Sequence, residues 1–274
     1  MVLSTISIVL VVLFDYTNGF HDASNIIAPV IASRAMTPIQ AVAIVAVFEF
    51  LGPVLGGTAV ANTIGKFVTV DDVIADKAVV IILCGIVAAI VWNLGTWWIG
   101  IPSSSSHALV GGLAGAVVVS VGADHVLWGF AELSKGHVTG VTKVLIGLII
   151  SPLIGFWVGF LLQKLTASVL VRAKPTANRT LRRSQFLTSA WLAFSHGAND
   201  AQKSMGIITL VLVLSGRISE FVVPFWVILT CASAITLGIL SGGWRIVRTV
   251  GFGIYKIRPL HALNAQLTSA GVIY

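Results

Sequence analysis

Apolar residues along the chain are grouped in long blocks, with polar residues gathered in short segments between them. The clearest blocks are Pro38–Ala61, Ala78–Gly100, Val144–Leu162 and Phe221–Gly242. Each is at or near the roughly 20 residues that an α-helix needs to cross a hydrocarbon layer of about 30 Å. Weaker blocks lie at Met1–Phe14, His107–Gly122, Phe186–Phe194, Met205–Ser215 and Ala262–Tyr274. The pattern predicts an all-α integral membrane protein, a polytopic helix bundle.

Composition agrees with a membrane protein, and the distribution of charge argues against nucleic-acid binding. Apolar residues make up 57% of the 274 residues and charged residues 10%, whereas an ordinary soluble domain has about 25% charged residues. The net charge of +7 lies largely in segments 164–183 and 245–258, between apolar blocks. Basic segments of this kind are expected on the cytoplasmic face, and the acidic segment Lys66–Lys77 is expected outside.

Two similar polar motifs lie about 180 residues apart in the chain. Asn18–Asn25 (NGFHDASN) and Ser195–Lys203 (SHGANDAQK) each place small and amide residues before an Asp-Ala pair. Further along, Thr63–Gly65 (TIG) is echoed by Thr249–Gly251 (TVG). We therefore predict two repeats in the membrane. They are residues 1–163 and 186–274, the second incomplete, joined by a basic cytoplasmic linker at 164–185.

Counting the crossings predicts that the second repeat is inverted relative to the first. Five crossings precede the linker: Met1–Phe20, Pro38–Ala61, Ala78–Gly100, His107–Gly122 and Val144–Leu162. An odd number reverses the direction of the second half, and a cytoplasmic linker then places the N-terminus outside the cell membrane. Inverted repeats with polar breaks at matching positions are typical of secondary transporters.

Three acidic residues, Asp22, Glu49 and Asp200, lie within apolar surroundings. Ionisable groups at such depth are costly and usually line a pathway for ions or substrate. Asp22 and Asp200 could instead cap a helix break, and Glu49 could pair with an arginine or lysine. The alternatives stay open at this point.

Amide and glycine residues around the two aspartates are suited to a cation site. Asn18, Asn25 and Asn199 offer amide oxygens, and we expect Gly19 and Gly197 to let the helices unwind and free carbonyl groups. Carboxylates with such oxygens suit a hard monovalent cation, so sodium is expected at Asp22 and Asp200. His21 and His196 leave proton handling as an alternative, while no His or Cys cluster has the sequence spacing of a zinc site.

A third polar segment, Pro102–His107 (PSSSSH), suits an anion. Proline fixes a break, and a helix that begins at Ser103–Ser106 would direct unpaired amide groups and a partial positive charge at a ligand. An ordinary serine-rich turn is the alternative. Irregular backbone at membrane depth is tolerated only where it is buried or lines a cavity, which favours the anion site.

At these residues the sequence resembles the inorganic phosphate transporter (PiT) family. The matching segments are Gly19–Asn25, Ala32–Ala35 (ASRA), Thr63–Lys66 (TIGK), Pro102–Ala108, Ser195–Lys203 and Arg258–His261 (RPLH). The resemblance implies an inverted-repeat fold and cation-coupled phosphate uptake. It also implies that Asp22, Asn25, Asn199 and Asp200 serve the coupling cations and phosphate, and that Ser103–Ser106 cradle phosphate.

The sequence departs from the family pattern at two places. Lys203 stands where the first motif has Asn25, and it would supply a positive charge for phosphate or displace a cation. The family's second half usually carries its own Pro-Ser-Thr-Thr-His segment after the Arg-Pro-x-His stretch, whereas this sequence stops at Tyr274. We expect a partial chain on that ground.

The sequence analysis therefore predicts a symporter of inorganic phosphate driven by sodium or protons. Phosphate is expected at Ser103, Ser104, Ser105, Ser106, Asn25, Asn199 and Lys203, and the coupling cation at Asp22, Asn18, Asp200, Asn199 and Glu49. A sulfate permease of the same fold is the nearest alternative. An anion channel is more remote because it would need a continuous ring of charged residues. A membrane hydrolase using Ser104 and His107 is also more remote, because no triad or metal set accompanies that pair. No cofactor is expected beyond the coupling ion, and the expected partners include membrane lipid and a second copy in a homodimer.

Overall fold

The computed structural model describes residues 2–64 and 75–273, and every regular element in these ranges is a helix. The longer helices are α1 (Val2–Ala32), α2 (Pro38–Leu55), α4 (Ala75–Ile99), α5 (Ser105–Val121), α7 (Gly140–Val169), α8 (Ala177–Leu214), α9 (Phe225–Ser241) and α11 (Pro259–Ile273). Short helices α3 (Ala59–Ile64), α6 (Phe130–Leu133) and α10 (Trp244–Arg248) connect them, with a 3₁₀ turn at Ala123–His125 and a π-helical turn at Thr249–Gly253. The predicted all-α membrane fold is confirmed.

Several of these helices are long and apolar enough to span a membrane. They are Val2–Ala32, Pro38–Leu55, Lys77–Ile99 and Gly140–Val169, together with the pair Phe225–Ser241 and Trp244–Gly253, which is bent by 55°. α8 is longer than any of them but carries many polar and basic residues along its length. The apolar blocks of the sequence thus correspond to helices of membrane-spanning length.

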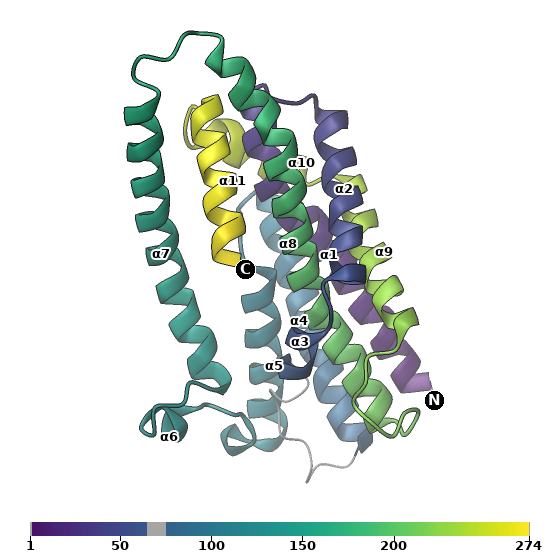
Figure 1. Ribbon diagram of the computed structural model, residues 1–274. Helices are drawn as coiled ribbons and strands as arrows, with labels where there is room; N and C mark the ends of the chain where they lie inside the picture. Colours follow the sequence, from purple (N-terminus) through teal and green to yellow (C-terminus); the bar gives the residue numbers. More distant parts are fainter. Residues whose placement is uncertain (1, 65–74, 274) are drawn as a thin grey trace.

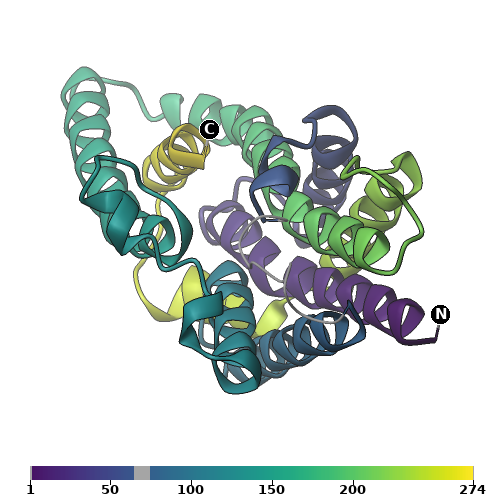
Figure 2. The same cartoon turned by 90° about the horizontal axis from the view of Figure 1, so that it is seen from below.

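The bundle is arranged around α1 and α8, which carry the two polar motifs. α2, α4 and α9 pack against this pair, while α7 stands at the edge of the bundle with α11 between it and α8 (Figures 1 and 2). Side chains from α1, α8 and α9 form one buried core that includes Phe14, Met205 and Cys231. A second buried core near the other end includes Ile27, Val45 and Ile239.

One helix crossing occurs twice in the bundle. A side chain added at Gly19 of α1 would collide with the carbonyl oxygen of Ile235 in α9, and one added at Gly197 of α8 would collide with that of Glu49 in α2. On the facing helices, Gly238 in the same way meets the carbonyl of Tyr16, and Gly52 meets that of Phe194. Gly197 follows Gly19 by the same 178 positions that separate Phe194 from Tyr16. Each crossing pairs a helix of one predicted repeat with a helix of the other, and the two-repeat organisation stays a prediction.

The direction of the two motif helices agrees with an inverted arrangement. α1 begins at the end of the bundle where α8 finishes, and the two run in opposite directions (Figure 1). The α7–α8 connection lies at the end opposite the start of α1, which is the relation that the crossing count predicts. That this end is cytoplasmic stays a prediction from charge, and the acidic segment 66–77 lies largely outside the described residues.

The predicted unwinding at Gly19 and Gly197 is wrong, because both glycines lie inside continuous helices. An unbroken helix keeps its backbone groups hydrogen-bonded in the membrane, and the missing side chains are used for close helix contact instead. The structure has its breaks elsewhere. One follows Gly100 and contains Pro102, as predicted, and another lies at Gly242–Gly243 between α9 and α10.

The basic linker at 164–185 is mostly helical. α7 extends to Val169 and α8 begins at Ala177, so that residues 170–176 alone connect them outside these helices. The weaker blocks Phe186–Phe194 and Met205–Ser215 are parts of α8, joined through the polar motif.

Candidate functional site

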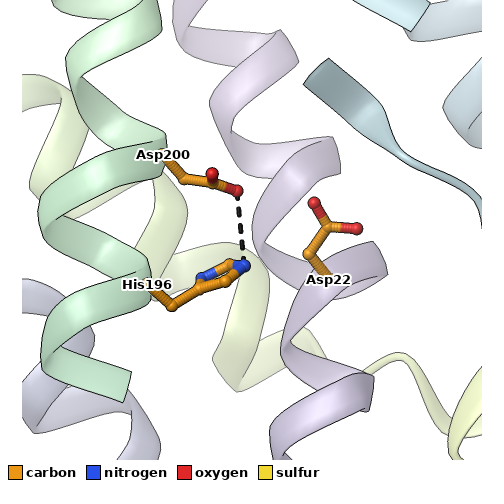
Figure 3. Close-up of side chains that lie close together, drawn as sticks. All are labelled: Asp22, His196 and Asp200. Atoms are coloured by element: carbon orange, nitrogen blue, oxygen red, sulfur yellow. Dashed lines mark ion pairs between the residues drawn. The ribbon is translucent and has the colours of Figure 1, made fainter. Parts of the chain in front are cut away.

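The two aspartates that the sequence paired meet between α1 and α8. Asp22, His196 and Asp200 each offer one metal-ligating atom, and these atoms all lie within 4.8 Å of one another (Figure 3). Asp22 and Asp200 are each 7% exposed, so their charges are held away from bulk solvent. The sequence shows no histidine cluster, but the fold brings His196 and Asp200 of α8 beside Asp22 of α1, a distant part of the chain.

Asn18 and Ser105 connect the two aspartates. The Asn18 Nδ2 donates a hydrogen bond of 3.2 Å to Asp200 Oδ2. Ser105 Oγ lies 2.6 Å from Asn18 Oδ1 and 2.5 Å from Asp22 Oδ2. A hydroxyl group has one proton to donate, and here it faces two acceptor oxygens. The result is a compact set of oxygen atoms of the kind that hard cations prefer.

Each histidine of the two motifs joins an aspartate to a neighbouring element. His21 Nδ1 lies 2.9 Å from Asp22 Oδ1, and its Nε2 lies 3.1 Å from Thr96 Oγ1 of α4 and 3.3 Å from Ser103 Oγ. His21 is fully buried. The imidazole therefore connects the Asp22 carboxylate to the segment that precedes α5.

His196 occupies the corresponding role on α8. Its Nδ1 lies 2.5 Å from Glu49 Oε1 of α2, and its Nε2 lies 3.3 Å from Asp200 Oδ2. Glu49 is 1% exposed, and its other oxygen, Oε2, has no hydrogen-bond partner among the described atoms. The predicted alternative for Glu49, a pair with arginine or lysine, is thus replaced by a pair with a histidine.

Lys203 brings a positive charge to the same place. Its Nζ forms an ion pair with Asp200 Oδ1 and donates a hydrogen bond to Ser106 Oγ. Lys203 therefore lies between a carboxylate and the first turn of α5. Of the two roles the sequence allowed, this position fits a fixed charge beside the anion segment.

The four serines of the anion segment have four different contacts. Ser103 faces His21, Ser105 faces Asn18 and Asp22, and Ser106 faces Lys203. Ser104 is the N-cap of α5, and its Oγ accepts a hydrogen bond of 3.3 Å from the His107 amide. The amides of Ser105 and Ser106 belong to the first turn, where a helix offers them no internal acceptor.

A cavity of about 570 Å³ adjoins this segment. Ser103, Ser104 and His107 line it together with Trp92 of α4 and Leu148 of α7. Most of its other lining is apolar, and Asp22, Asp200 and Lys203 are not part of it.

Two predicted residues do not join the cluster. Asn25 is exposed, and the structure shows no side-chain hydrogen bond from it; it lies one turn beyond Asp22, toward the end of α1. Asn199 is partly exposed and likewise forms none. Adjacent residues on an α-helix point about 100° apart, so Asn199 and Asp200 lie on different sides of α8. Thr96, which the sequence analysis missed and no motif marks, contacts His21 and Ser103 through its hydroxyl group.

Comparisons with known proteins give the chain its family. A sequence model of the phosphate transporter family matches residues 18–274. The chain is 40% identical, over its whole length and 79% of the relative, to a "probable low-affinity inorganic phosphate transporter" of Bacillus subtilis. A protein of the same description from Mycobacterium tuberculosis is 42% identical over 98% of this chain and 62% of its own length.

A solved structure has the same fold. It is described as "the sodium-dependent phosphate transporter", with a TM-score of 0.85, 23% sequence identity, and coverage of 100% of this chain and 84% of that one. These related proteins are described as transporters, which confirms the prediction of a transporter rather than an enzyme. Together with the family match and the paired aspartate motifs, they show that the chain belongs to the phosphate transporter family.

Proposed function

We propose that the protein is a secondary transporter that carries inorganic phosphate across the cell membrane together with monovalent cations. The proposal depends above all on one observation. Ser105, at the start of α5, touches Asp22 directly and Asp200 through Asn18, so the anion segment and both acidic motifs form one cluster. A shared cluster is what coupling between an anion and a cation requires.

The charges of the cluster explain why phosphate would need a cation. Asp22 and Asp200 are acidic, and Lys203 is a basic residue paired with Asp200. Like charges about 4 Å apart repel by about 4 kcal/mol at an effective dielectric constant of 20. Phosphate at the first turn of α5 would therefore be repelled by the carboxylates unless cations neutralise them. Bound cations lower that cost, and bound phosphate in turn strengthens cation binding, because such coupling is reciprocal.

Sodium fits the oxygen cluster better than a proton does. The Asp22 carboxylate, the Asn18 amide oxygen and the Ser105 hydroxyl are hard oxygen ligands gathered around one point. The description of the structural neighbour as sodium-dependent supports this choice. A proton is the alternative ion, and the buried Glu49–His196 pair is its candidate carrier. Relatives described as inorganic phosphate transporters support phosphate over sulfate.

Uptake of radiolabelled phosphate into proteoliposomes tests this proposal. A sodium gradient directed inward should drive uptake above the level reached with equal sodium on both sides, and excess unlabelled sulfate should leave it unchanged. A pH gradient in the absence of sodium separates proton coupling from sodium coupling. Uptake that depends on the phosphate concentration alone, and on neither the sodium gradient nor the pH gradient, would contradict cation coupling.

A further inference from the structure

The motifs Ala32–Ala35 and Arg258–His261 take no part in the central cluster, and both contribute residues to the wall of one cavity. The end of α1 with Arg34 and the segment leading through Arg258 to α11 line a cavity of about 730 Å³. The start of α8 completes its wall with Arg182. The cavity lies at the end of the bundle where α8 and α11 begin (Figure 1), the end that the charge pattern places in the cytoplasm.

A buried amide fixes the three elements that form this cavity. The Ser33 Oγ of α1 donates a hydrogen bond of 2.8 Å to Gln185 Oε1 of α8. The Gln185 Nε2 donates one of 3.2 Å to the carbonyl oxygen of Pro259, the first residue of α11. Gln185 is fully buried and Ser33 is 3% exposed. The cavity is therefore a built feature of the fold rather than a gap between mobile chain segments.

The charged side chains around the cavity all have the same sign. Arg34, Arg182, Lys256 and Arg258 line it, and its lining contains no acidic residue among the residues that the structure describes. Within the same ranges, none of the four forms an ion pair. Four cations gathered around one cavity repel one another, so a bound anion would be favoured by all of them.

Arg34 stands where local backbone stability favours a different residue. Its φ is 57°, in the left-handed region, at the point where α1 ends. The Ala35 amide closes the helix with a hydrogen bond of 2.9 Å to the carbonyl of Val30. Glycine adopts this conformation without steric cost and is the usual residue at such helix ends. An arginine here is locally unfavourable, and a role for its charge in the cavity accounts for it.

We propose that this cavity binds a phosphoryl anion, at a site separate from the central cluster. Arginine forks match the oxygens of a phosphoryl group in bidentate fashion, and three of the four cations are arginines. Pro259 on the wall is the first residue of α11, a helix of 15 residues, and the start of such a helix carries a partial positive charge. The ligand is either inorganic phosphate or the phosphate headgroup of an anionic lipid, which share this chemistry. Exposed Phe252 and Tyr255 on the wall suit a membrane interface.

Thiol labelling inside the cavity tests the proposal without relying on transport. Ile257→Cys places a thiol on the wall, and Cys84→Ala removes the exposed native cysteine, while Cys231 is buried. The labelling rate is measured in phosphatidylcholine nanodiscs as inorganic phosphate replaces chloride at constant ionic strength. A second series uses nanodiscs that contain phosphatidic acid, with no free phosphate.

Saturable slowing of labelling by phosphate, or slowing by phosphatidic acid alone, would support the site and tell the two sources apart. Loss of one charged contact should weaken phosphate protection about tenfold or more in Arg34→Gly and in Arg258→Gln. Glycine adopts the left-handed conformation at position 34 without steric cost, so Arg34→Gly should fold. Arg183→Gln, next to Arg182 but not on the cavity wall, is the matched control, and phosphate should slow labelling in it as much as in the parent. Labelling that ignores both phosphate and phosphatidic acid, or an equal effect of Arg34→Gly and Arg183→Gln, would overturn the proposal.

Discussion

The amide of Asn18 in the first acidic motif donates a hydrogen bond of 3.2 Å to the carboxylate of Asp200 in the second. The two residues are 182 positions apart in the chain. This contact joins α1 to α8 at the centre of the bundle, and it makes the two motifs one site rather than two similar ones. Several expectations depend on it.

Replacing Asn18 by alanine should weaken cation binding. The change removes an oxygen from the cluster and leaves Asp200 without one of its donors, and a hydrogen bond to a charged group is worth about 1.5–3 kcal/mol. We expect the sodium concentration that half-saturates phosphate uptake to rise roughly tenfold or more.

Asn199→Ala is the control for this change. Asn199 precedes Asp200 but has no side-chain contact in the cluster, so its removal should leave the sodium dependence close to the parent. The sequence motif alone would assign the two asparagines similar importance. Equal effects of the two changes would therefore favour the motif over the geometry described here.

The serines before and within α5 should differ in their effects. Ser105→Ala removes the hydroxyl that touches Asn18 and Asp22, and phosphate affinity should fall by roughly ten- to hundredfold. Ser104→Ala removes the N-cap and should lower the free energy of unfolding by about 1 kcal/mol, with a smaller effect on affinity. Phosphate binding and thermal unfolding of both variants check this order. Ser168→Ala, near the end of α7, is the control, and phosphate affinities of all three equal to the parent would reduce the segment to a serine-rich turn.

The close helix crossings should make Gly19 and Gly197 intolerant of alanine. An added methyl group at either position meets a backbone carbonyl of the facing helix, and overpacking of this kind costs about 1–3 kcal/mol. The melting temperature should therefore fall for both variants. Gly155→Ala in α7, where an added methyl group meets nothing within 4 Å, should leave it unchanged or raise it. Equal melting temperatures for all three variants would show that the crossings are looser than described.

The topology predicts where two engineered cysteines become accessible. Lys135 follows α6 at one end of the bundle, and Asn178 lies at the start of α8, at the opposite end (Figure 1). Each is replaced by cysteine. In sealed vesicles, a membrane-impermeant thiol reagent should label Lys135→Cys from the outer face and Asn178→Cys from the cytoplasmic face. Cys84→Ala supplies the background. Labelling of both from the same face would contradict the inverted arrangement.

Local patterns in the sequence were enough to identify the class of fold and the two main acidic residues. Long apolar blocks predict spanning helices because a helix satisfies the hydrogen bonds of its backbone groups internally, as the membrane requires. Asp22 and Asp200 were identifiable because a carboxylate within apolar surroundings is costly, and Pro102 marked a true break. The polar motif of α8 divided that helix into two short apolar blocks, since hydropathy does not register backbone hydrogen bonds that continue through polar residues.

Contacts between distant residues were beyond the reach of those patterns. The Glu49–His196 pair joins residues 147 positions apart on α2 and α8, and no spacing rule connects them. Gly19 and Gly197 were interpreted as points of unwinding because a glycine in a sequence signals either flexibility or close packing. The choice between these depends on the helix that faces it. In the same way, whether Asn199 points toward the cluster depends on the side of α8 against which α1 packs.

Neutralising the two central carboxylates tests the account most directly. Asp22→Asn and Asp200→Asn keep the shape of the side chains but remove the charges that would balance bound cations. Phosphate uptake driven by a sodium gradient should collapse in both variants, while yield and melting temperature stay near those of the parent. Asp124→Asn, in an exposed turn, should behave like the parent. Sodium-driven uptake at the parent level in Asp22→Asn and Asp200→Asn, with unchanged sodium dependence, would contradict cation coupling at this cluster.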